Sequence, residues 1–367
     1  MLVKMVHLVP LLLLRLKKCA KYLFSVVRNR NPSIYYVYAI FLLVFIIEVV
    51  TYYCMVFYWH DIQCYDRNKC TRMLIVADPQ LIGLHNEVVP QLTSIAIWDS
   101  DRYLSKTFWQ AYRFIDPDVV IFLGDLLDEG STADDKEFNL YVDRFYNIFE
   151  NQENVLNIWI AGDNDIGGEY PDYVTYHKIQ RFTKAFSQPD VITYRDVTCV
   201  KANTFQYKLP IMPELANITN FNIVLSHVPL LSSLSSFVDK VLDATHPKFL
   251  FAAHTHNSMV ITTRQKSRHN RAITPINPDD DIHVYNLNTG DLFEIIVPTC
   301  SYRMGTFNIG YGFAVVDKAS LQYTVLWSPS RFFQLKIYGI FCIVFILCGL
   351  YKCTKRTKAY TTIHPTV

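Results

Sequence analysis

The stretch Val119–Gly130, with the sequence VVIFLGDLLDEG, decides the fold class. Its first five residues are apolar and are followed by Gly124 and Asp125, a pattern typical of a parallel β-strand that is buried on both faces. Ligands of open α/β sheets bind just beyond the carboxyl ends of such strands. Asp125 occupies that position. The stretch therefore predicts an α/β protein whose functional site includes Asp125.

Polar side chains follow four further strand-like runs in the same way. The runs are MLIVA, VLNIWIAG, FNIVLS and KFLFAA. Helical periodicity over residues 101–115 and 134–150 lies between the first three strands of the chain, and periodicity over residues 173–186 follows the third. Alternating strands and helices predict βαβ units with right-handed crossovers. We therefore expect one sheet edge to collect carboxylate, carboxamide and imidazole groups, namely Asp78, Gln80, Asp125, Asp163, His227, His254 and His256.

This set of side chains predicts a metal centre. Three carboxylates that meet at one place repel one another, and a cation between them removes the repulsion. Imidazole and carboxylate oxygen are ligands shared by Mn, Fe and Zn. The set is large enough for two ions, with Asp125 central. A metal pair can activate a water and hold both the attacking and the leaving oxygen of a phosphoryl group, so the set points to phosphoester hydrolysis.

The second half of the chain, beyond residue 190, is rich in strand-like runs. Together with the first half it predicts one α/β domain on two sheets. Residues 264–281 are polar and predict a mobile loop.

Two long apolar runs, residues 37–59 and 332–351, are each long enough to span a bilayer and have aromatic residues at their edges. A buried core helix is the alternative for each. Residues 1–36 and 352–367 hold eleven of the 35 Lys and Arg residues and no Asp or Glu. These basic flanks predict cytosolic termini and a lumenal domain over residues 60–331, with Met1–Leu14 at the membrane surface. Because that domain is acidic, a nucleic acid partner is excluded.

Two features agree with a lumenal domain. Asn217 begins an N-glycosylation sequon, Asn-Ile-Thr. Cys64, Cys70, Cys199 and Cys300 are an even number of cysteines within the domain, and they allow three pairings. Cys64 and Cys70 would close a small loop, and Cys199 could pair with Cys300.

The motifs resemble those of the calcineurin-like metallophosphoesterases. That family carries D-x-H, G-D-x-x-D, G-N-H-[DE], a lone His and G-H-x-H, in this order. The matching stretches here are Asp78-Pro79-Gln80, Gly124-Asp125-Leu126-Leu127-Asp128, Gly162-Asp163-Asn164-Asp165, Ser226-His227 and Ala253-His254-Thr255-His256. The resemblance implies a two-sheet α/β/β/α sandwich, here flanked by two transmembrane helices.

Four stretches, VADPQLI, DSDRYL, FLGDLLDEG and VPTCSYR, resemble a membrane-bound subgroup of the family. Members of that subgroup are phosphodiesterases that remove ethanolamine phosphate from the glycan of GPI anchors in the early secretory pathway. The resemblance implies residence in the ER, ER exit sites or Golgi, a GPI glycolipid or GPI-anchored proteins as partners, and a role in the export of those proteins.

The resemblance also implies residue roles. One metal ion would be held by Asp78, Gln80, Asp125 and His256, and the other by Asp125, Asp163, His227 and His254. Arg102 would approach the phosphate or the glycan. The two ions would be Mn²⁺, because Gln80 replaces the usual His and an amide oxygen favours Mn over Zn.

The stretch GDND departs from the family's GNHD. Asp163 stands where a neutral Asn ligand is expected, and Asn164 stands where a His would protonate the leaving group. An amide is not a general acid, and such a loss costs roughly 10²–10⁴-fold in rate. Asp165 or His85 could compensate. The alternatives are a catalytically weak or silent cargo-binding protein that keeps the fold, and a phosphoesterase acting on another lumenal lipid or sugar phosphate.

Overall fold

The computed structural model describes residues 32–85, 89–150, 154–210, 221–232, 235–265, 267–286, 289–317 and 320–363. The chain divides into two compact units, Met1–Cys54 and Met55–Val367. In the first unit, helix α3 (Pro32–Phe45) continues through a π-helical turn, η1 (Ile46–Val50), into α4 (Thr51–Cys54). The segment Met1–Leu14 and the sequon at Asn217 lie outside the described residues.

Two helical stretches are long and apolar enough to cross a bilayer, Tyr35–Tyr58 and Arg331–Tyr351, with mean hydropathies of 2.4 and 2.1. The first includes the 3₁₀ turn η2 (Met55–Tyr58), and the second is the start of helix α11 (Arg331–Ile363). They match the predicted runs in position. The match concerns length and composition, and membrane crossing remains a prediction.

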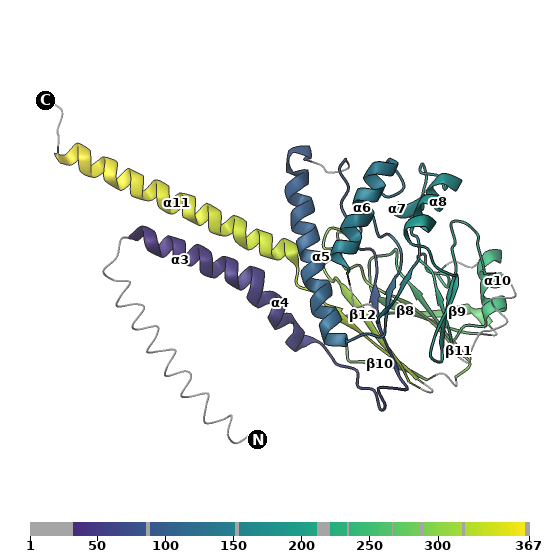
Figure 1. The fold of residues 1–367 in the computed structure, drawn as a ribbon. Helices are drawn as coiled ribbons and strands as arrows, with labels where there is room; N and C mark the ends of the chain where they lie inside the picture. Colours follow the sequence, from purple (N-terminus) through teal and green to yellow (C-terminus); the bar gives the residue numbers. More distant parts are fainter. Residues whose placement is uncertain are drawn as a thin grey trace, which may run out of the picture. The chain divides into compact units, whose positions relative to one another are not determined.

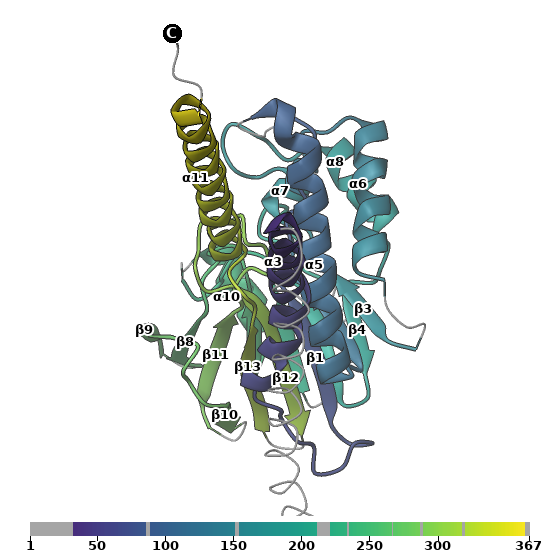
Figure 2. The ribbon, with the colours of Figure 1, turned by 90° about the vertical axis from the view of Figure 1, so that its left-hand side faces the viewer.

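The second unit is built on two mixed sheets (Figures 1 and 2). In the described residues one sheet has the strand order β10-β13-β12-β1-β2-β3, and the other has the order β4-β5-β6-β7-β11-β8-β9. The strands of the first sheet are β1 (Thr71–Val76), β2 (Val119–Phe122), β3 (Leu156–Trp159), β10 (His283–Asn286), β12 (Gly310–Asp317) and β13 (Ser320–Trp327). Those of the second are β4 (Val191–Tyr194), β5 (Val197–Lys201), β6 (Phe221–Leu225), β7 (Phe249–Ala252), β8 (Met259–Arg264), β9 (Ser267–Pro275) and β11 (Asp291–Ile296).

Each sheet has a parallel core. Strands β1, β2 and β3 are parallel in the first sheet, with Ile75 opposite Ile121 and Ile121 opposite Ile158. Strands β5, β6, β7 and β11 are parallel in the second. The carboxyl ends of parallel neighbours lie at the same edge of a sheet, so the loops after β1, β2 and β3, and those after β6 and β7, gather side by side.

The side chains of β1 show how the layers pack. Leu74 and Val76 belong to a core that includes Phe108 of α5 (Thr93–Ile115) and Phe145 of α6 (Asp135–Ile148). Met73 and Ile75, which point to the opposite face of β1, belong to a second core that contains residues of both sheets. On the far face of the second sheet, α10 (Ser236–Thr245) closes a third core through Val241. Helices therefore cover the outer face of each sheet, and the predicted α/β/β/α order is confirmed.

The predicted loop over residues 264–281 is wrong in large part. Strand β9 occupies Ser267–Pro275 and pairs antiparallel with β8, with Ile261 opposite Ile273. It is the last strand of its sheet, and its Ile273 is 62% exposed. An edge strand with one solvated face needs little apolar sequence, so its polarity was misleading.

One of the two predicted disulfides is present and the other is not. Cys64 and Cys70 form a disulfide, which confirms the small loop. Cys199 and Cys300 are buried thiols, so the pairing of these two is wrong. Cys199 lies in the core between the sheets, whereas Cys300 lies in the core under α5 and α6. The first sheet separates these cores.

A buried polar cluster, which we call the latch, ties the first turn of α11 to α5. Asp99 of α5 accepts a hydrogen bond from the Tyr302 hydroxyl, at 2.9 Å, and pairs with the Arg331 guanidinium. Asp99 is 9% exposed and Arg331 is 4% exposed. Next to them, the Tyr103 hydroxyl donates to the Pro329 carbonyl at 2.8 Å. The stretches DSDRYL and VPTCSYR therefore meet at the start of the C-terminal apolar helix.

Candidate metal centre

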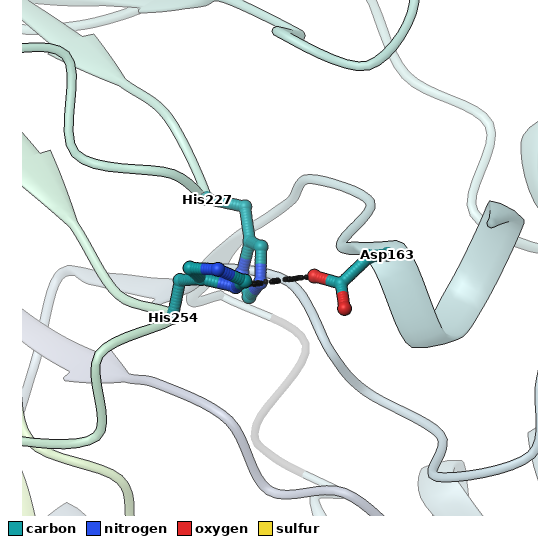
Figure 3. Close-up of side chains that lie close together, drawn as sticks. All are labelled: Asp163, His227 and His254. Carbon is teal, nitrogen blue, oxygen red and sulfur yellow. Dashed lines mark hydrogen bonds and ion pairs between the residues drawn. The ribbon is translucent and has the colours of Figure 1, made fainter. Parts of the chain in front are cut away.

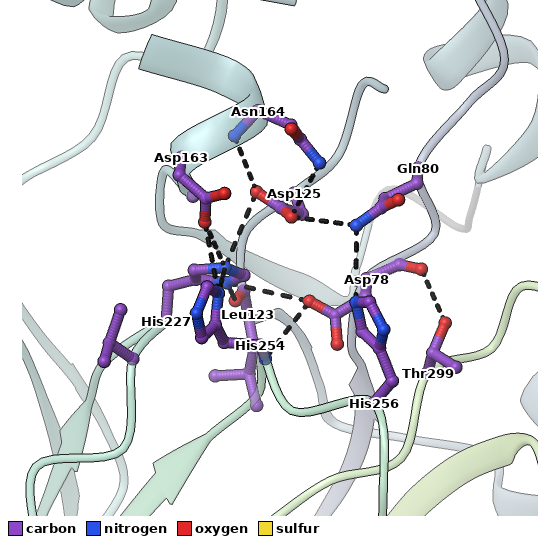
Figure 4. Close-up of polar contacts among 12 residues, drawn as sticks. Asp78, Gln80, Leu123, Asp125, Asp163, Asn164, His227, His254, His256 and Thr299 are labelled. Carbon is purple, nitrogen blue, oxygen red and sulfur yellow. Dashed lines mark hydrogen bonds and ion pairs between the residues drawn. The ribbon is translucent and has the colours of Figure 1, made fainter. Parts of the chain in front are cut away.

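Five strand ends supply the candidate ligands, as the sequence predicts. Asp78 and Gln80 follow β1, Asp125 follows β2, and Asp163 begins the short helix α7 (Asp163–Ile166) after β3. His227 follows β6, and the pair His254 and His256 follows β7. The structure brings all seven side chains together on the loops that follow these strands (Figure 4).

The backbone at the centre is under strain. Nine non-glycine residues have positive φ among the described residues, and five of them are candidate ligands: Asp78, Gln80, Asp125, His254 and His256. Left-handed backbone is rare for non-glycine residues and costs about 1–3 kcal/mol each. Such strain persists where the surrounding structure holds it. Here backbone hydrogen bonds link the loops, for example from the Gln80 amide to the Asp125 carbonyl at 2.9 Å.

Two glycines let the loops approach the ligands. A Cβ added at Gly162 would lie 2.1 Å from Asp125 Oδ1, and one added at Gly124 would lie 2.6 Å from His227 Nδ1. Gly124 also has φ of +88°. No larger residue fits at either position without moving a ligand.

One half of the centre is formed by Asp163, His227 and His254 (Figure 3). Asp163 Oδ1 lies 3.0 Å from His227 Nε2 and 3.2 Å from His254 Nδ1, and those two nitrogens are 3.2 Å apart. His227 Nδ1 lies 2.8 Å from the Leu123 carbonyl oxygen, to which it donates. That hydrogen bond fixes the tautomer and leaves Nε2 as a ligand atom.

The other half contains Asp78, Asp125, Gln80 and His256. Asp78 and Asp125 join His227 in a second group whose ligand atoms all lie within 4.8 Å of one another. The side-chain amide nitrogen of Gln80, Nε2, is 2.9 Å from Asp125 Oδ2 and 3.5 Å from His256 Nε2. Rotating this amide by half a turn places its oxygen at the same point, as ligation of a cation requires.

The electrostatics of the centre fit a cation. Burial raises the pKa of Asp78 to about 7, and burial also raises the pKa of Asp125. Burial disfavours the charged form of His227, but the Asp125 carboxylate and its neighbours outweigh it and raise the pKa of that ring to about 10. Asp78 Oδ2 is buried without a hydrogen-bond partner. Such an atom, in a group of oxygen and nitrogen ligands, is suited to a divalent metal ion.

Asn164 and Asp165 take different positions. Asn164 donates to Asp125 twice, from its backbone nitrogen at 2.9 Å and from its side-chain amide at 3.0 Å. Asp165 is fully buried and accepts hydrogen bonds from the backbone amides of Leu126, Leu127 and Gly162. Burial raises the pKa of Asp165 to about 8. Its geometry suits holding two loops together, rather than contact with a substrate.

Arg102 and His85 are placed on other parts of the fold. Arg102 lies on α5, and its guanidinium is 5.3 Å from the centre of the Trp98 ring. His85 Nε2 lies 2.7 Å from Glu137 of α6, and its side chain is 64% exposed. Neither residue belongs to the two ligand groups described above.

Glu169 is a residue near the centre that the sequence analysis did not identify. Its Oε1 lies 3.4 Å from His254 Nε2, on the side of the imidazole that faces away from Asp163. The signal available was an acid a few residues beyond the GDND stretch, behind Gly167 and Gly168.

Comparison with known proteins decides the family. The model of the calcineurin-like phosphoesterase family matches residues 71–258, which include every candidate ligand. The chain is a calcineurin-like phosphoesterase. Among curated relatives, Metallophosphoesterase 1 of Ailuropoda melanoleuca is 28% identical to this phosphoesterase over 171 residues, which are 45% of this chain and 42% of the relative. The chain therefore spans less than half of that relative's length.

Two further likenesses concern larger parts of this phosphoesterase. The Metallophosphoesterase 1 homolog of Caenorhabditis elegans is 24% identical over 309 residues, 70% of this chain and 77% of the relative. The purple acid phosphatase PPD1 of yellow lupin (Lupinus luteus) aligns with 70% of this chain and 52% of its own, at 15% identity and a TM-score of 0.46.

Proposed function

We propose that this chain is a two-metal phosphodiesterase that removes ethanolamine phosphate from the glycan of GPI anchors in the early secretory pathway. The observation that carries the proposal is the convergence of three carboxylates, three imidazoles and one carboxamide at facing strand ends. The family supports hydrolysis of a phosphoester. The substrate rests on the resemblance of VADPQLI, DSDRYL, FLGDLLDEG and VPTCSYR to the GPI-directed subgroup.

Each side chain then has a defined task. When bound, a divalent metal pair, which we expect to be Mn²⁺, would supply Lewis-acid stabilisation of the phosphoryl oxygens and would lower the pKa of a water. Asp78, Gln80, Asp125 and His256 would hold one ion, and Asp163, His227 and His254 would hold the other together with Asp125. Asn164 orients the shared carboxylate of Asp125 through its two hydrogen bonds.

The location is part of the proposal. Two candidate spans with basic flanks support a multi-pass membrane protein whose termini are cytosolic and whose metal centre is lumenal. A lumenal centre would meet GPI glycolipids and GPI-anchored proteins on the leaflet that carries them.

The decisive assay measures release of ethanolamine phosphate from a GPI glycan by the full chain in detergent, with Mn²⁺, Zn²⁺, Mg²⁺ and Ca²⁺ compared. We expect release that depends on metal and is highest with Mn²⁺. The control is Asp125→Asn, which keeps the shape of the side chain and removes its charge. Folded, metal-loaded protein that releases nothing with any of these ions would refute the proposal.

Asn164 favours a second candidate, a catalytically weak or silent protein that keeps the fold and binds cargo. Its amide occupies the place of the expected proton donor and bonds to Asp125. If Asn164→His creates strong turnover where the native chain has none, and the native chain binds GPI glycan after the metals are removed, the second candidate holds. A phosphoesterase acting on another lumenal lipid or sugar phosphate would instead turn over that substrate and leave GPI glycan intact.

A further inference from the structure

A short loop after α7 places one carboxylate at the open side of the metal centre. Asp163 and His227 have side chains that are 9% and 1% exposed, whereas that of His254 is 29% exposed and that of Glu169 is 63% exposed. The centre therefore opens to solvent past His254. Glu169 lies at this opening, 3.4 Å from the outer nitrogen of the His254 ring.

The loop that carries Glu169 is held in place. Gly168 N donates to the Asp172 carbonyl at 2.8 Å, and Asp172 N donates back to the Glu169 carbonyl at 2.7 Å. Lys178 Nζ donates to the Tyr173 carbonyl at 2.9 Å and also pairs with the Asp172 carboxylate. Glu169 is thus presented by a preformed turn, which lowers the entropic cost of binding a ligand.

Gly168 permits this turn. Its φ is +143°, and a Cβ added there would lie 2.3 Å from the Phe205 ring. Phe205 in turn packs against His227, with the ring centres 6.2 Å apart. The turn is therefore fitted to the metal centre through a ring that contacts one of its ligands.

Two exposed aromatic residues, Tyr170 and Tyr173, lie in the same turn as Glu169. Tyr170 is 86% exposed and Tyr173 is 68% exposed, and their ring centres are 6.2 Å apart in an edge-to-face arrangement. Aromatic faces attract alkylammonium groups through the ring quadrupole. A carboxylate and two exposed aromatic rings carried by one short turn supply the chemistry that an ammonium group needs.

The charges at the opening select for a zwitterion. Two divalent ions against Asp78, Asp125 and Asp163 would leave one net positive charge, which suits a phosphodiester anion. Glu169 adds a negative charge at the rim. It therefore repels the second negative charge of a phosphate monoester and attracts a positive charge linked to the phosphodiester.

We propose that Glu169, Tyr170 and Tyr173 form a subsite for an ammonium group joined to the scissile phosphodiester by a short carbon chain. The inference rests on the proposed function and names what that centre recognises. The shared chemistry is an aminoalkyl phosphodiester, which occurs as ethanolamine phosphate on a glycan and as the headgroup of a phospholipid. Glu169 also pairs with His254, so a positioning role has to be separated from recognition.

The kinetic test compares two diesters of equal size, 4-nitrophenyl 2-aminoethyl phosphate and 4-nitrophenyl propyl phosphate, with the full chain in detergent and Mn²⁺. We expect kcat/KM to be roughly fivefold to tenfold higher for the amine, as one exposed charge pair with cation–π contacts provides. Glu169→Gln should bring this ratio close to one. Asp243→Asn, the same charge change on α10, should leave the ratio as it is.

A binding test is independent of turnover. O-phosphoethanolamine and propyl phosphate are titrated into the Mn²⁺-loaded chain by calorimetry, and we expect the amine to bind several-fold tighter, an advantage that Glu169→Gln abolishes. If the native chain binds as expected but hydrolyses no diester, the proposed function fails and the subsite stands. If Glu169→Gln weakens both ligands equally, or slows both diesters equally, Glu169 acts only through His254 and the subsite is refuted.

A third experiment distinguishes the two substrates that carry this aminoalkyl group. It compares turnover of GPI glycan with turnover of phosphatidylethanolamine in vesicles. In both cases the subsite predicts slower release by Glu169→Gln than by the native chain. Faster turnover of the glycan assigns the subsite to the glycan's ethanolamine phosphate, and faster turnover of the vesicles assigns it to a lipid headgroup. An equal rate for native chain and variant on both substrates would overturn the subsite.

Discussion

At the residue scale, the close approach of Gly162 to the candidate ligand Asp125 decides whether the metal centre forms. Gly162→Ala would place a methyl group 2.1 Å from Asp125 Oδ1 and 2.4 Å from the Asp125 backbone nitrogen. We expect the variant to fold but to bind less than the full metal complement, with activity falling by at least tenfold. Metal content by mass spectrometry measures this. Gly290→Ala is the control, because a Cβ there has nothing within 4 Å.

A single buried carboxyl predicts a pH dependence of stability. Burial raises the pKa of Glu294 to about 7, from 4.5, although the Leu230 and Leu231 amides donate to its two oxygens at 2.6 and 2.8 Å. The folded state therefore holds the proton more tightly than the unfolded state. Its contribution to stability is full below about pH 4.5 and is lost as the pH rises through about 7, by roughly 3 kcal/mol.

The variant Glu294→Gln tests this assignment. It cannot ionise, so the slope of unfolding free energy between pH 5 and pH 7.5 should flatten relative to the native chain. The variant is expected to be less stable at pH 5, since its amide cannot accept both backbone hydrogen bonds. Denaturant titrations at several pH values measure both effects, and an unchanged slope would contradict the assignment.

The sequence predicts the ligand residues because each follows a strand that its apolar run makes visible. Asp125 after VVIFLG is the clearest case. The left-handed backbone at Asp78 and His254 has no such signal, since tertiary contacts impose it. Glu169 was missed for a similar reason. Its contact with His254 joins positions far apart in the sequence, and only the folded loops bring them together.

At the element scale, the latch predicts how firmly α11 is joined to the domain. Asp99→Asn would leave the guanidinium of Arg331 buried beside a neutral group, which costs about 3 kcal/mol when a buried pair loses one partner. We expect a lower melting temperature and faster hydrogen exchange at the start of α11. Asp101→Asn on the same helix is the matched control, because its pair with Arg144 is more exposed.

A loss of stability from Asp99→Asn no larger than that from Asp101→Asn would show that the latch carries little stability.

At this scale the prediction of elements was good where both faces of a strand are buried, as in β2 and β7. It failed for β9, where pairing with β8 rather than apolar sequence makes the strand. It also missed β5, which follows β4 after a tight turn.

At the scale of the whole molecule, the sequence predicts two apolar spans, one domain between them, and its orientation. The structure confirms two stretches of sufficient length, Tyr35–Tyr58 and Arg331–Tyr351, and a domain of two sheets. Orientation rests on the charge of the flanks, which the fold does not test. The disulfide between Cys64 and Cys70 agrees with an oxidising compartment.

Glycosylation tests the orientation. If residues 60–331 are lumenal, the sequon at Asn217 lies in the compartment of the oligosaccharide transferase, and we expect the chain made in cells to shift in gel mobility after treatment with a glycosidase. Asn217→Gln should remove the shift. Protease protection of the domain in sealed microsomes gives a second reading, and digestion of the domain in intact vesicles would reverse the predicted topology.

The latch has a consequence for reach. Residues 328–330 are all that separate the end of β13 from the start of α11, and the Ser328 amide is bonded to the Ile309 carbonyl at 2.8 Å. Because Arg331 is paired with Asp99, we expect the metal centre to keep a fixed distance from the start of α11. If α11 spans a bilayer, the distance from the membrane surface to the metal centre is then fixed. Extra residues inserted after Trp327 would change that distance, and with it the phosphoesters that the centre can reach, while leaving the metal centre intact.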